Sequence, residues 1–253
     1  MAKPEATDRD DILAMDIGAT SIKYCLLDDD GQIVSRVGRL STPYPCAPDT
    51  MVGLLVEQIR DSGCSRVGVG FPGEMHDGRV LEPGNLSRAG GFTSDIDESI
   101  HERWIGLDLQ RALCDASERD VRVINDAALA ALGCSRGTGT ELVLTLGTGL
   151  GIALVVDGAL VRIRDVGAEV FERGQTFDQL LGDFSRSLDE YQWNEMVVRT
   201  AQKFVLEFGA DVVHLSGGNA GRVDLDGFSS VSFIVLVGDN NMTLRGARQL
   251  FPA

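Results

Sequence analysis

Two similar stretches, whose glycine turns begin 129 residues apart, constrain this chain more than any other feature. They read ILAMDIGATSIKYCLLDDDGQIV, from residue 12, and LVLTLGTGLGIALVVDGALV, from residue 142. Each has the pattern of strand, glycine turn, strand, Asp-Gly turn and strand. An ungapped alignment superimposes Asp16 on Thr145, Gly18 on Gly147, Leu27 on Val156 and Asp28 on Asp157. Chance resemblance is the alternative, but the pattern favours a duplicated three-stranded unit and therefore two domains.

Strand and helix patterns alternate through the rest of the chain. Spacing of apolar residues predicts helices over 49–63, 106–119, 126–137, 191–208 and 242–251. Apolar runs predict strands over 65–75, 121–126, 211–218 and 231–237, the last of them buried. His214, inside one of these runs, is predicted to be a satisfied core residue. This alternation predicts an α/β fold with mixed sheets.

The expected domain boundaries follow from the same strand and helix patterns. We expect a disordered tail over 1–10, an N-terminal domain over 11–124 and a C-terminal domain over 125–253. Under this division, the last helix can still pack against the N-terminal domain. The stretch 86–103 is polar and rich in glycine, and it lacks clear periodicity. It is predicted to be an insertion or a flexible lid.

Composition excludes several classes of protein. The formal charge of −15 disfavours a surface for nucleic acid or an anionic membrane, since both need clustered Lys and Arg. The five cysteines are widely spread, form no CxxC pair and lie far from the three histidines, so neither a zinc site nor a disulfide framework is expected. The polar N-terminus and the lack of a long apolar run predict a cytoplasmic protein without a membrane partner.

The turn GTGLG offers a candidate phosphate site in the second stretch. Gly147 and Gly149 let the backbone approach a phosphate closely with its N–H groups, and the Thr148 hydroxyl could add a donor. The spacing is not that of a dinucleotide fingerprint or a Walker A loop. Taken alone, a plain hairpin with permissive glycines is the alternative.

The matching turn in the first stretch, DIGATSIK, adds charged groups. Asp16 at the end of an apolar run could hold Mg²⁺ through water, since this ion uses one or two carboxylates plus substrate phosphates. Gly18, Thr20 and Lys23 could then meet the phosphate oxygens. The alternative is that Asp16 caps the turn and Lys23 is solvated. The second glycine turn favours phosphate binding.

Two further motifs follow predicted strands. Asn125 and Asp126 open an alanine-rich helix, where Asp126 is either an N-cap or a general base for a substrate hydroxyl. Gly217 and Gly218 in SGGNAG could let a nucleotide lie against the backbone, although Gly-Gly before a helix is a common turn.

Taken in chain order, DIGATSIK, the Asn125-Asp126 pair, GTGLG and SGGNAG resemble the ROK family of sugar kinases, and most closely its polyphosphate/ATP glucokinase branch. GVGFPGEM (68–75), Asn85-Leu86 and WIGLDL (104–109) are also similar, and the resemblance covers about residues 11–250. It implies two actin-like (ribonuclease H-like) α/β domains with mixed sheets around a central cleft, and a donor held by two glycine hairpins. It also implies roles for single residues: Asp126 as the base for a sugar hydroxyl, Asn85 and Asn125 as sugar contacts, Asp16 near Mg²⁺, and Gly217 and Gly218 beside adenosine.

One segment departs from the family pattern. Where the family has Glu-x-Gly-His for the sugar, this chain has Asp165, Gly167 and Ala168, and Glu169 is the residue that could compensate. A lost hydrogen bond to a substrate hydroxyl weakens binding by about 1–3 kcal/mol, which lowers the affinity for a sugar or changes the preferred one.

The resulting hypothesis is a sugar kinase that uses ATP or polyphosphate, Mg²⁺ and Asp126 as general base. We expect a homodimer. The alternative is a catalytically impaired sensor or partner-binding protein on the same scaffold, which the Asp165 and Ala168 departures motivate.

Overall fold

Two compact units make up the chain, and the computed structural model describes residues 9–90 and 94–251 of it. Unit 1 comprises the residues up to Asp126 and those from Leu244 onward, and unit 2 is Ala127–Thr243. The disordered tail predicted over 1–10 is wrong at its end, because Arg9 and Asp10 belong to strand β1, Arg9–Ile17. An Arg66 guanidinium bond to the Asp10 carbonyl supports this extension. Residues 1–8 lie outside the described residues.

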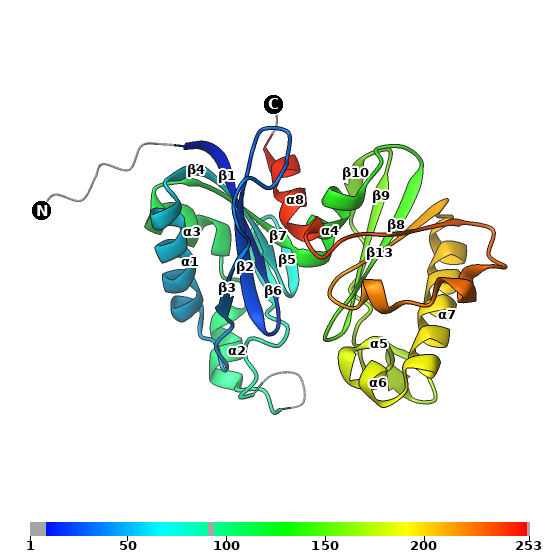
Figure 1. The fold of residues 1–253 in the computed structure, drawn as a ribbon. Helices are drawn as coiled ribbons and strands as arrows, with labels where there is room; N and C mark the ends of the chain where they lie inside the picture. Colours follow the sequence, from blue (N-terminus) through cyan, green and yellow to red (C-terminus); the bar gives the residue numbers. More distant parts are fainter. Residues whose placement is uncertain (1–8, 91–93, 252–253) are drawn as a thin grey trace, which may run out of the picture. The chain divides into compact units, whose positions relative to one another are not determined.

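The sheet of unit 1 has the strand order β3-β2-β1-β4-β7 (Figure 1). Its strands after β1 are β2 (Ser21–Leu27), β3 (Gly38–Ser41), β4 (Cys64–Phe71) and β7 (Asp120–Asn125). β1, β2 and β3 are antiparallel neighbours, whereas β4 and β7 run parallel to β1. The other elements are the hairpin β5 (Glu74–His76) and β6 (Arg79–Glu82) and the helices α1 (Pro48–Ser62), α2 (Glu98–Trp104) and α3 (Leu109–Ser117).

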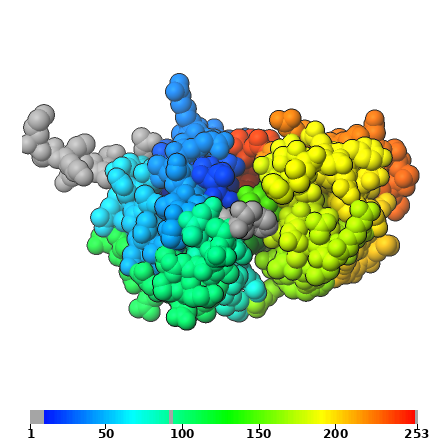
Figure 2. All heavy atoms as spheres, turned by 90° about the horizontal axis from the view of Figure 1, so that it is seen from below, coloured from blue at the N-terminus to red at the C-terminus, as the bar shows by residue number. Residues whose placement is uncertain are grey.

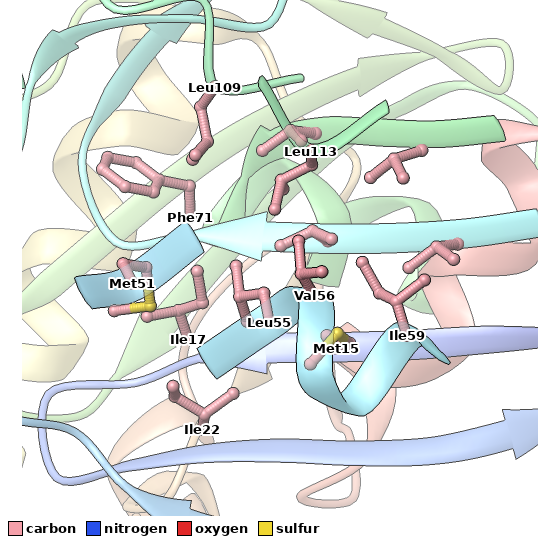
Figure 3. Packing of buried hydrophobic residues seen from close by; sticks show 14 of the residues in the cluster. Met15, Ile17, Ile22, Met51, Leu55, Val56, Ile59, Phe71, Leu109 and Leu113 are labelled. Carbon is pink, nitrogen blue, oxygen red and sulfur yellow. The ribbon is translucent and has the colours of Figure 1, made fainter. Parts of the chain in front are cut away.

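Helices α1 and α3 cover one face of this sheet. Figure 3 shows Met51, Leu55 and Ile59 of α1, one turn apart, packed against Met15 and Ile17 of β1. All five side chains are fully buried. The helical spacing on α1 and the alternation on β1 therefore meet in one apolar layer, as the sequence pattern predicts.

The other face of the sheet receives the C-terminal segment, drawn in red in Figure 1. Figure 2 draws the same segment as red spheres. This segment comprises α8 (Met242–Gly246) and the 3₁₀ turn η3 (Ala247–Leu250). A Cβ at Gly68 of β4 would lie only 2.6 Å from the Ala247 Cβ, so η3 approaches the strand closely. The guanidinium of Arg122 donates to the Leu250 carbonyl and lies 4.6 Å from the centroid of the Phe251 ring.

Placing a charge at Ala247 tests how tightly η3 packs. Ala247 is fully buried, so Ala247→Glu is expected to lower the free energy of unfolding by about 3 kcal/mol or more, because a buried unpaired charge is costly. Gln249→Glu, at an exposed position of the same turn, is the matched control and is expected to change little. Urea denaturation measures both. Equal effects would show that η3 does not pack on the sheet.

Unit 2 repeats the sheet of unit 1 in order and direction. Its order is β10-β9-β8-β13-β14, with strands β8 (Thr140–Leu146), β9 (Leu150–Val156), β10 (Ala159–Val161), β13 (Val212–Ser216) and β14 (Ile234–Val237). β8, β9 and β10 are antiparallel, whereas β13 and β14 run parallel to β8. The hairpin comprises β11 (Val170–Glu172) and β12 (Gln175–Thr176). The helical elements are α4 (Asp126–Cys134), α5 (Phe177–Leu181), α6 (Asp183–Leu188), α7 (Glu190–Phe208), η1 (Ala220–Arg222) and η2 (Leu225–Phe228).

The common topology agrees with a duplication, but the ungapped alignment is wrong beyond the glycine turns. Ile17 pairs with Ile22, so residues 18–21 form the first turn. Leu146 pairs with Leu150, so residues 147–149 form the second. Because the second turn is one residue shorter, the strand that follows is displaced by one position. The structural counterpart of Leu27 is therefore Val155 and not Val156.

Helices cover both faces of the sheet of unit 2. On one face, Trp193, Val197 and Phe204 of α7 belong to the same buried cluster as Leu142 and Leu144 of β8. On the other face, α4 packs its small alanines against β8 and β9. The Asp189 side chain caps the start of α7, and Gly209 ends the helix in the left-handed conformation.

Two predictions about the fold are wrong. The strand over 231–237 is not buried: β14 is an edge strand paired with β13, and Ile234 and Leu236 are 51% and 36% exposed. The described part of 86–103 is not a flexible lid, because Ser87 is buried and its hydroxyl lies 3.3 Å from Nδ1 of His101 in α2. That this stretch is an insertion stays a prediction. Residues 91–93 of this stretch lie outside the described residues.

Candidate functional site

The first glycine turn is held open by a threonine from β3's end. Thr42 is buried, and its hydroxyl donates to the Gly18 carbonyl at 2.6 Å. The Gly18 N–H is bonded across the turn to the Ser21 carbonyl at 3.1 Å. Within the described part of the chain, the N–H groups of Ala19 and Thr20 donate no hydrogen bond. The turn therefore presents two backbone donors to a ligand.

Beside this turn, Asp16 and Lys23 are opposite each other on β1 and β2. The Lys23 Nζ lies 3.5 Å from Asp16 Oδ2, and Asp16 is 8% exposed. Burial raises the pKa of the Asp16 carboxyl above its ordinary value, while Lys23 and Arg39 act against this rise. A lone buried carboxylate suits an ion that is shared with substrate phosphates.

The second glycine turn follows the same scheme. The Gly147 N–H bonds across the turn to the Gly149 carbonyl at 3.1 Å. The Gly147 carbonyl accepts from the Asp183 N–H at 2.9 Å and from Asn219 Nδ2 at 3.2 Å. The N–H groups of Thr148 and Gly149 donate no hydrogen bond among residues 9–90 and 94–251. In each unit, the first glycine carbonyl of the turn is thus hydrogen-bonded within the protein, and two N–H groups of the turn remain as donors for a ligand.

The Gly-Gly motif lies directly against the second turn. Gly217 has φ of +88°, and a Cβ there would lie 2.5 Å from the Leu146 carbonyl oxygen, so only glycine fits. The N–H of Asn219, a buried residue, also donates to that oxygen at 3.0 Å. The structure thereby brings Gly217 and Gly218 beside Gly147. Sequence reasoning missed Asn219, whose signal was a polar residue directly after the paired glycines.

Asp178 of α5 is a second residue that sequence reasoning missed. Its Oδ1 accepts from the Leu150 N–H, next to the second turn, at 2.8 Å. Burial raises the pKa of the Asp178 carboxyl, the Leu150 N–H lowers it, and the nearby Asp165 raises it. No motif marks Asp178 in the sequence, because it lies in the first turn of an ordinary capped helix.

In the segment that departs from the family pattern, Asp165, Ala168 and Glu169 are exposed, whereas Val166 and Gly167 are buried. Asp165 Oδ1 accepts from the Gly167 N–H at 2.9 Å, which bends the segment locally. The Glu169 carboxylate accepts from Arg164 Nε at 2.7 Å, and Arg164 also bonds to Glu207. Glu169 is therefore already engaged by a cation. The roles of Asp165 and Glu169 toward a substrate stay predictions.

Asn125 of the Asn-Asp pair contacts the Pro-Gly turn formed by Pro72 and Gly73. Asn125 ends β7, and its Nδ2 donates to the Gly73 carbonyl at 3.0 Å and to Asp126 Oδ1 at 3.2 Å. The loop that carries Asn85 reaches the same turn, since a Cβ at Gly84 would lie 2.1 Å from the Pro72 carbonyl oxygen. The structure thus brings the Asn85 loop and Asp126 to one turn.

Residues 9–90 and 94–251 contain neither a cluster of metal ligands nor a membrane-spanning helix. In this part of the chain, no three His, Cys, Asp or Glu side chains gather in a way that could hold a metal ion. None of its helices is both long enough and apolar enough to cross a bilayer.

Comparison with known proteins identifies the family. The sequence model of the ROK family matches residues 12–168. The chain belongs to the ROK family. The resemblance drawn from the motifs is confirmed, and so is the fold class of two actin-like units with mixed α/β sheets.

Similar curated proteins are sugar kinases. The polyphosphate glucokinase of Mycobacterium leprae (strain TN) is 28% identical over 197 residues, 74% of this chain, and the match spans 56% of that protein's own length. The polyphosphate glucokinase of Mycobacterium tuberculosis (strain ATCC 25618 / H37Rv) is 24% identical over 236 residues, 87% of this chain and 82% of that protein. The sensor alternative is not favoured by these relatives.

Solved structures of the family share the fold. The inorganic polyphosphate/ATP-glucomannokinase from Arthrobacter sp. strain KM has a TM-score of 0.77 at 24% identity, and the match covers 96% of this chain and 98% of that one. A ROK family glucokinase from Streptomyces griseus, in complex with glucose and AMPPNP, has a TM-score of 0.73 at 18% identity, with 95% and 98% covered.

Proposed function

We propose that this protein is a sugar kinase that transfers a phosphoryl group from ATP or polyphosphate to a sugar hydroxyl. The observation that carries the proposal is the matched pair of glycine turns, each with its carbonyl held inward and two N–H groups available. Backbone N–H groups of this kind suit phosphate, and they bind it without net positive charge in a chain of formal charge −15. The kinase relatives support the same reaction.

On the donor side, phosphate oxygens would accept from the N–H groups of Ala19 and Thr20 in unit 1 and of Thr148 and Gly149 in unit 2. The Thr148 hydroxyl and the Lys23 ammonium would add donors, and Gly217 and Gly218 would lie against adenosine when ATP is the donor. Asp16, through water, would hold Mg²⁺, which neutralises charge on the phosphates.

On the acceptor side, Asp126 would act as general base. Its carboxylate is oriented by Asn125 Nδ2, which is held in turn by the Gly73 carbonyl. The proton of the sugar hydroxyl passes to Asp126 as the hydroxyl oxygen attacks the terminal phosphorus. The bond from that phosphorus to its bridging oxygen breaks, and ADP or a shortened polyphosphate leaves. Asn85, Asn125, Asp165 and Glu169 would contact the sugar. The homodimer and the cytoplasmic location stay predictions.

A screen of donors and acceptors tests this function. Purified protein is incubated with Mg²⁺, either ATP or polyphosphate, and each member of a panel of hexoses and amino sugars. Phosphorylated sugar is then measured by mass spectrometry. We expect turnover with at least one pair and its loss when EDTA removes Mg²⁺. If sugars shift the melting temperature but no pair yields product, the protein is a sensor and the proposal is wrong.

Restoring the family residues is expected to strengthen acceptor binding. The double variant Asp165→Glu, Ala168→His regains a longer carboxylate and an imidazole donor, so its KM for the best hexose should fall by about 5- to 150-fold, the equivalent of about 1–3 kcal/mol. The donor KM should change less than the hexose KM, because the substitutions leave the residues of the glycine turns unchanged. Steady-state kinetics measures both constants. An unchanged hexose KM would mean that this segment does not contact the acceptor.

A further inference from the structure

One residue of unit 2, Asp178, contacts both the donor turn and the segment that departs from the family pattern, the first through its carboxylate and the second through its backbone N–H. Asp178 Oδ1 accepts from the Leu150 N–H at 2.8 Å, and the Asp178 N–H donates to the Gly167 carbonyl at 2.9 Å. We propose that Asp178 is a positioning residue that ties the donor turn 147–149 to the acceptor segment 165–169. The proposal rests on the proposed function, which assigns these two substrates.

Two glycines make room for this side chain. A Cβ at Gly149 would lie 2.3 Å from Asp178 Oδ1, and a Cβ at Gly167 would lie 2.7 Å from the same oxygen. Real Cβ atoms do not come so close, so any other residue at either position would displace the carboxylate. The glycine of the donor turn and the glycine of the acceptor segment thus share one partner.

The backbone of α5 completes the connection at its other end. The Gly182 N–H, at the end of α5, donates to the Asp178 carbonyl at 2.9 Å, and the next N–H, that of Asp183, donates to the Gly147 carbonyl at 2.9 Å. A capping box between Thr176 and Gln179 holds the start of the helix. Helix α5 is therefore bonded to the acceptor segment where it begins, and the first residue of α6, directly after α5, is bonded to the donor turn. A shift of either would be transmitted to the other.

The chemistry of the Leu150 contact distinguishes a positioning role from a substrate contact. What the turn needs from Asp178 is an acceptor oxygen of the right shape, not a negative charge. Asp178→Asn keeps such an oxygen in the same place. Asp178→Ala removes it and leaves the buried Leu150 N–H without an acceptor. A direct substrate ligand, by contrast, would depend on the charge.

Amide hydrogen exchange of Leu150 in the free protein, measured by NMR, tests the contact without any turnover. In Asp178→Ala, we expect the Leu150 amide to exchange about tenfold faster or more than in the unchanged protein, and in Asp178→Asn within about threefold. Glu195→Ala, which removes an exposed carboxylate of α7, is the matched control and should leave the rate unchanged. An unchanged rate in Asp178→Ala overturns the proposal.

Kinetics with the productive donor and sugar tests the coupling. Asp178→Ala is expected to raise both the donor KM and the sugar KM by about tenfold, and Asp178→Asn to restore both to within about threefold. If the asparagine variant loses turnover as fully as the alanine variant, the charge is what matters and the proposal is wrong. If the unchanged protein phosphorylates no sugar, the proposed function and the substrate coupling fail together. The exchange rates then still decide whether Asp178 holds the turn.

Discussion

Replacing the general base should abolish most turnover and leave the fold intact. Asp126→Asn is expected to lower kcat for the best hexose by about 10²- to 10⁴-fold, because asparagine has the same shape but cannot take the hydroxyl proton. Its amide oxygen can still accept the bond from Asn125 Nδ2 that the structure shows at 3.2 Å. Neither the sugar KM nor the melting temperature should change appreciably. Coupled assays of ADP release and thermal unfolding measure the two effects.

A carboxylate on β7, the strand that leads into Asp126, provides the matched control for this variant. Asp120 begins β7, five residues before Asn125 on the same strand, and it is exposed. Asp120→Asn removes the same charge without touching the substrate and should keep normal turnover. If Asp126→Asn phosphorylated the sugar at the unchanged rate, another group would have to take the proton and the assignment of Asp126 would be wrong.

The second large effect concerns a buried carboxylate that serves stability. Glu141 of β8 is fully buried. Its carboxylate accepts hydrogen bonds from Ser135 Oγ at 2.7 Å, the Arg136 N–H at 2.9 Å and the Gly137 N–H at 3.1 Å. It also lies 2.6 Å from His214 Nε2. Glu141→Ala leaves these groups without an acceptor and should lower the free energy of unfolding by about 3–5 kcal/mol. Urea denaturation measures the loss. Glu195→Ala, an exposed site in the same unit, should change it little.

The same carboxylate predicts a dependence of stability on pH. Burial alone raises the pKa of Glu141, but hydrogen bonds from Ser135, Arg136 and His214 outweigh it and hold the pKa below its usual value of 4.5. Because the folded pKa is the lower one, this stabilisation is present above about pH 4.5 and is lost as the pH falls through the folded pKa. Glu141→Gln should flatten the acid limb of a plot of unfolding free energy against pH. An acid limb as steep as that of the unchanged protein would rule out this role.

Local patterns explain which parts of the fold were predictable. Alternating apolar residues and glycine turns gave the strands of both copies, since each signal lies within a few consecutive residues. The apolar neighbours of His214 predicted a satisfied core residue, and its contact with Glu141 confirms this. The pattern could not show that the second turn is shorter by one residue, because a register depends on the partner strand.

What only the tertiary structure decided lies in contacts between distant parts of the chain. Thr42 reaches Gly18, Asn219 reaches Gly147, and Asp178 reaches Leu150, over separations of 24, 72 and 28 residues. Such partners belong to no motif, because the fold and not the local sequence brings them together. The exposure of β14 could not be predicted from the sequence either, because an apolar strand has the same residue pattern at the centre of a sheet and at its edge.

The sequence by itself determined the family, the duplicated turns and the residue proposed as the base, because these depend on the order of short motifs. The tertiary structure decided which side chains hold the turns open and join the donor turn to the acceptor segment. The physical reason is that a hydrogen bond needs its two groups about 3 Å apart, and only the folded backbone sets that distance.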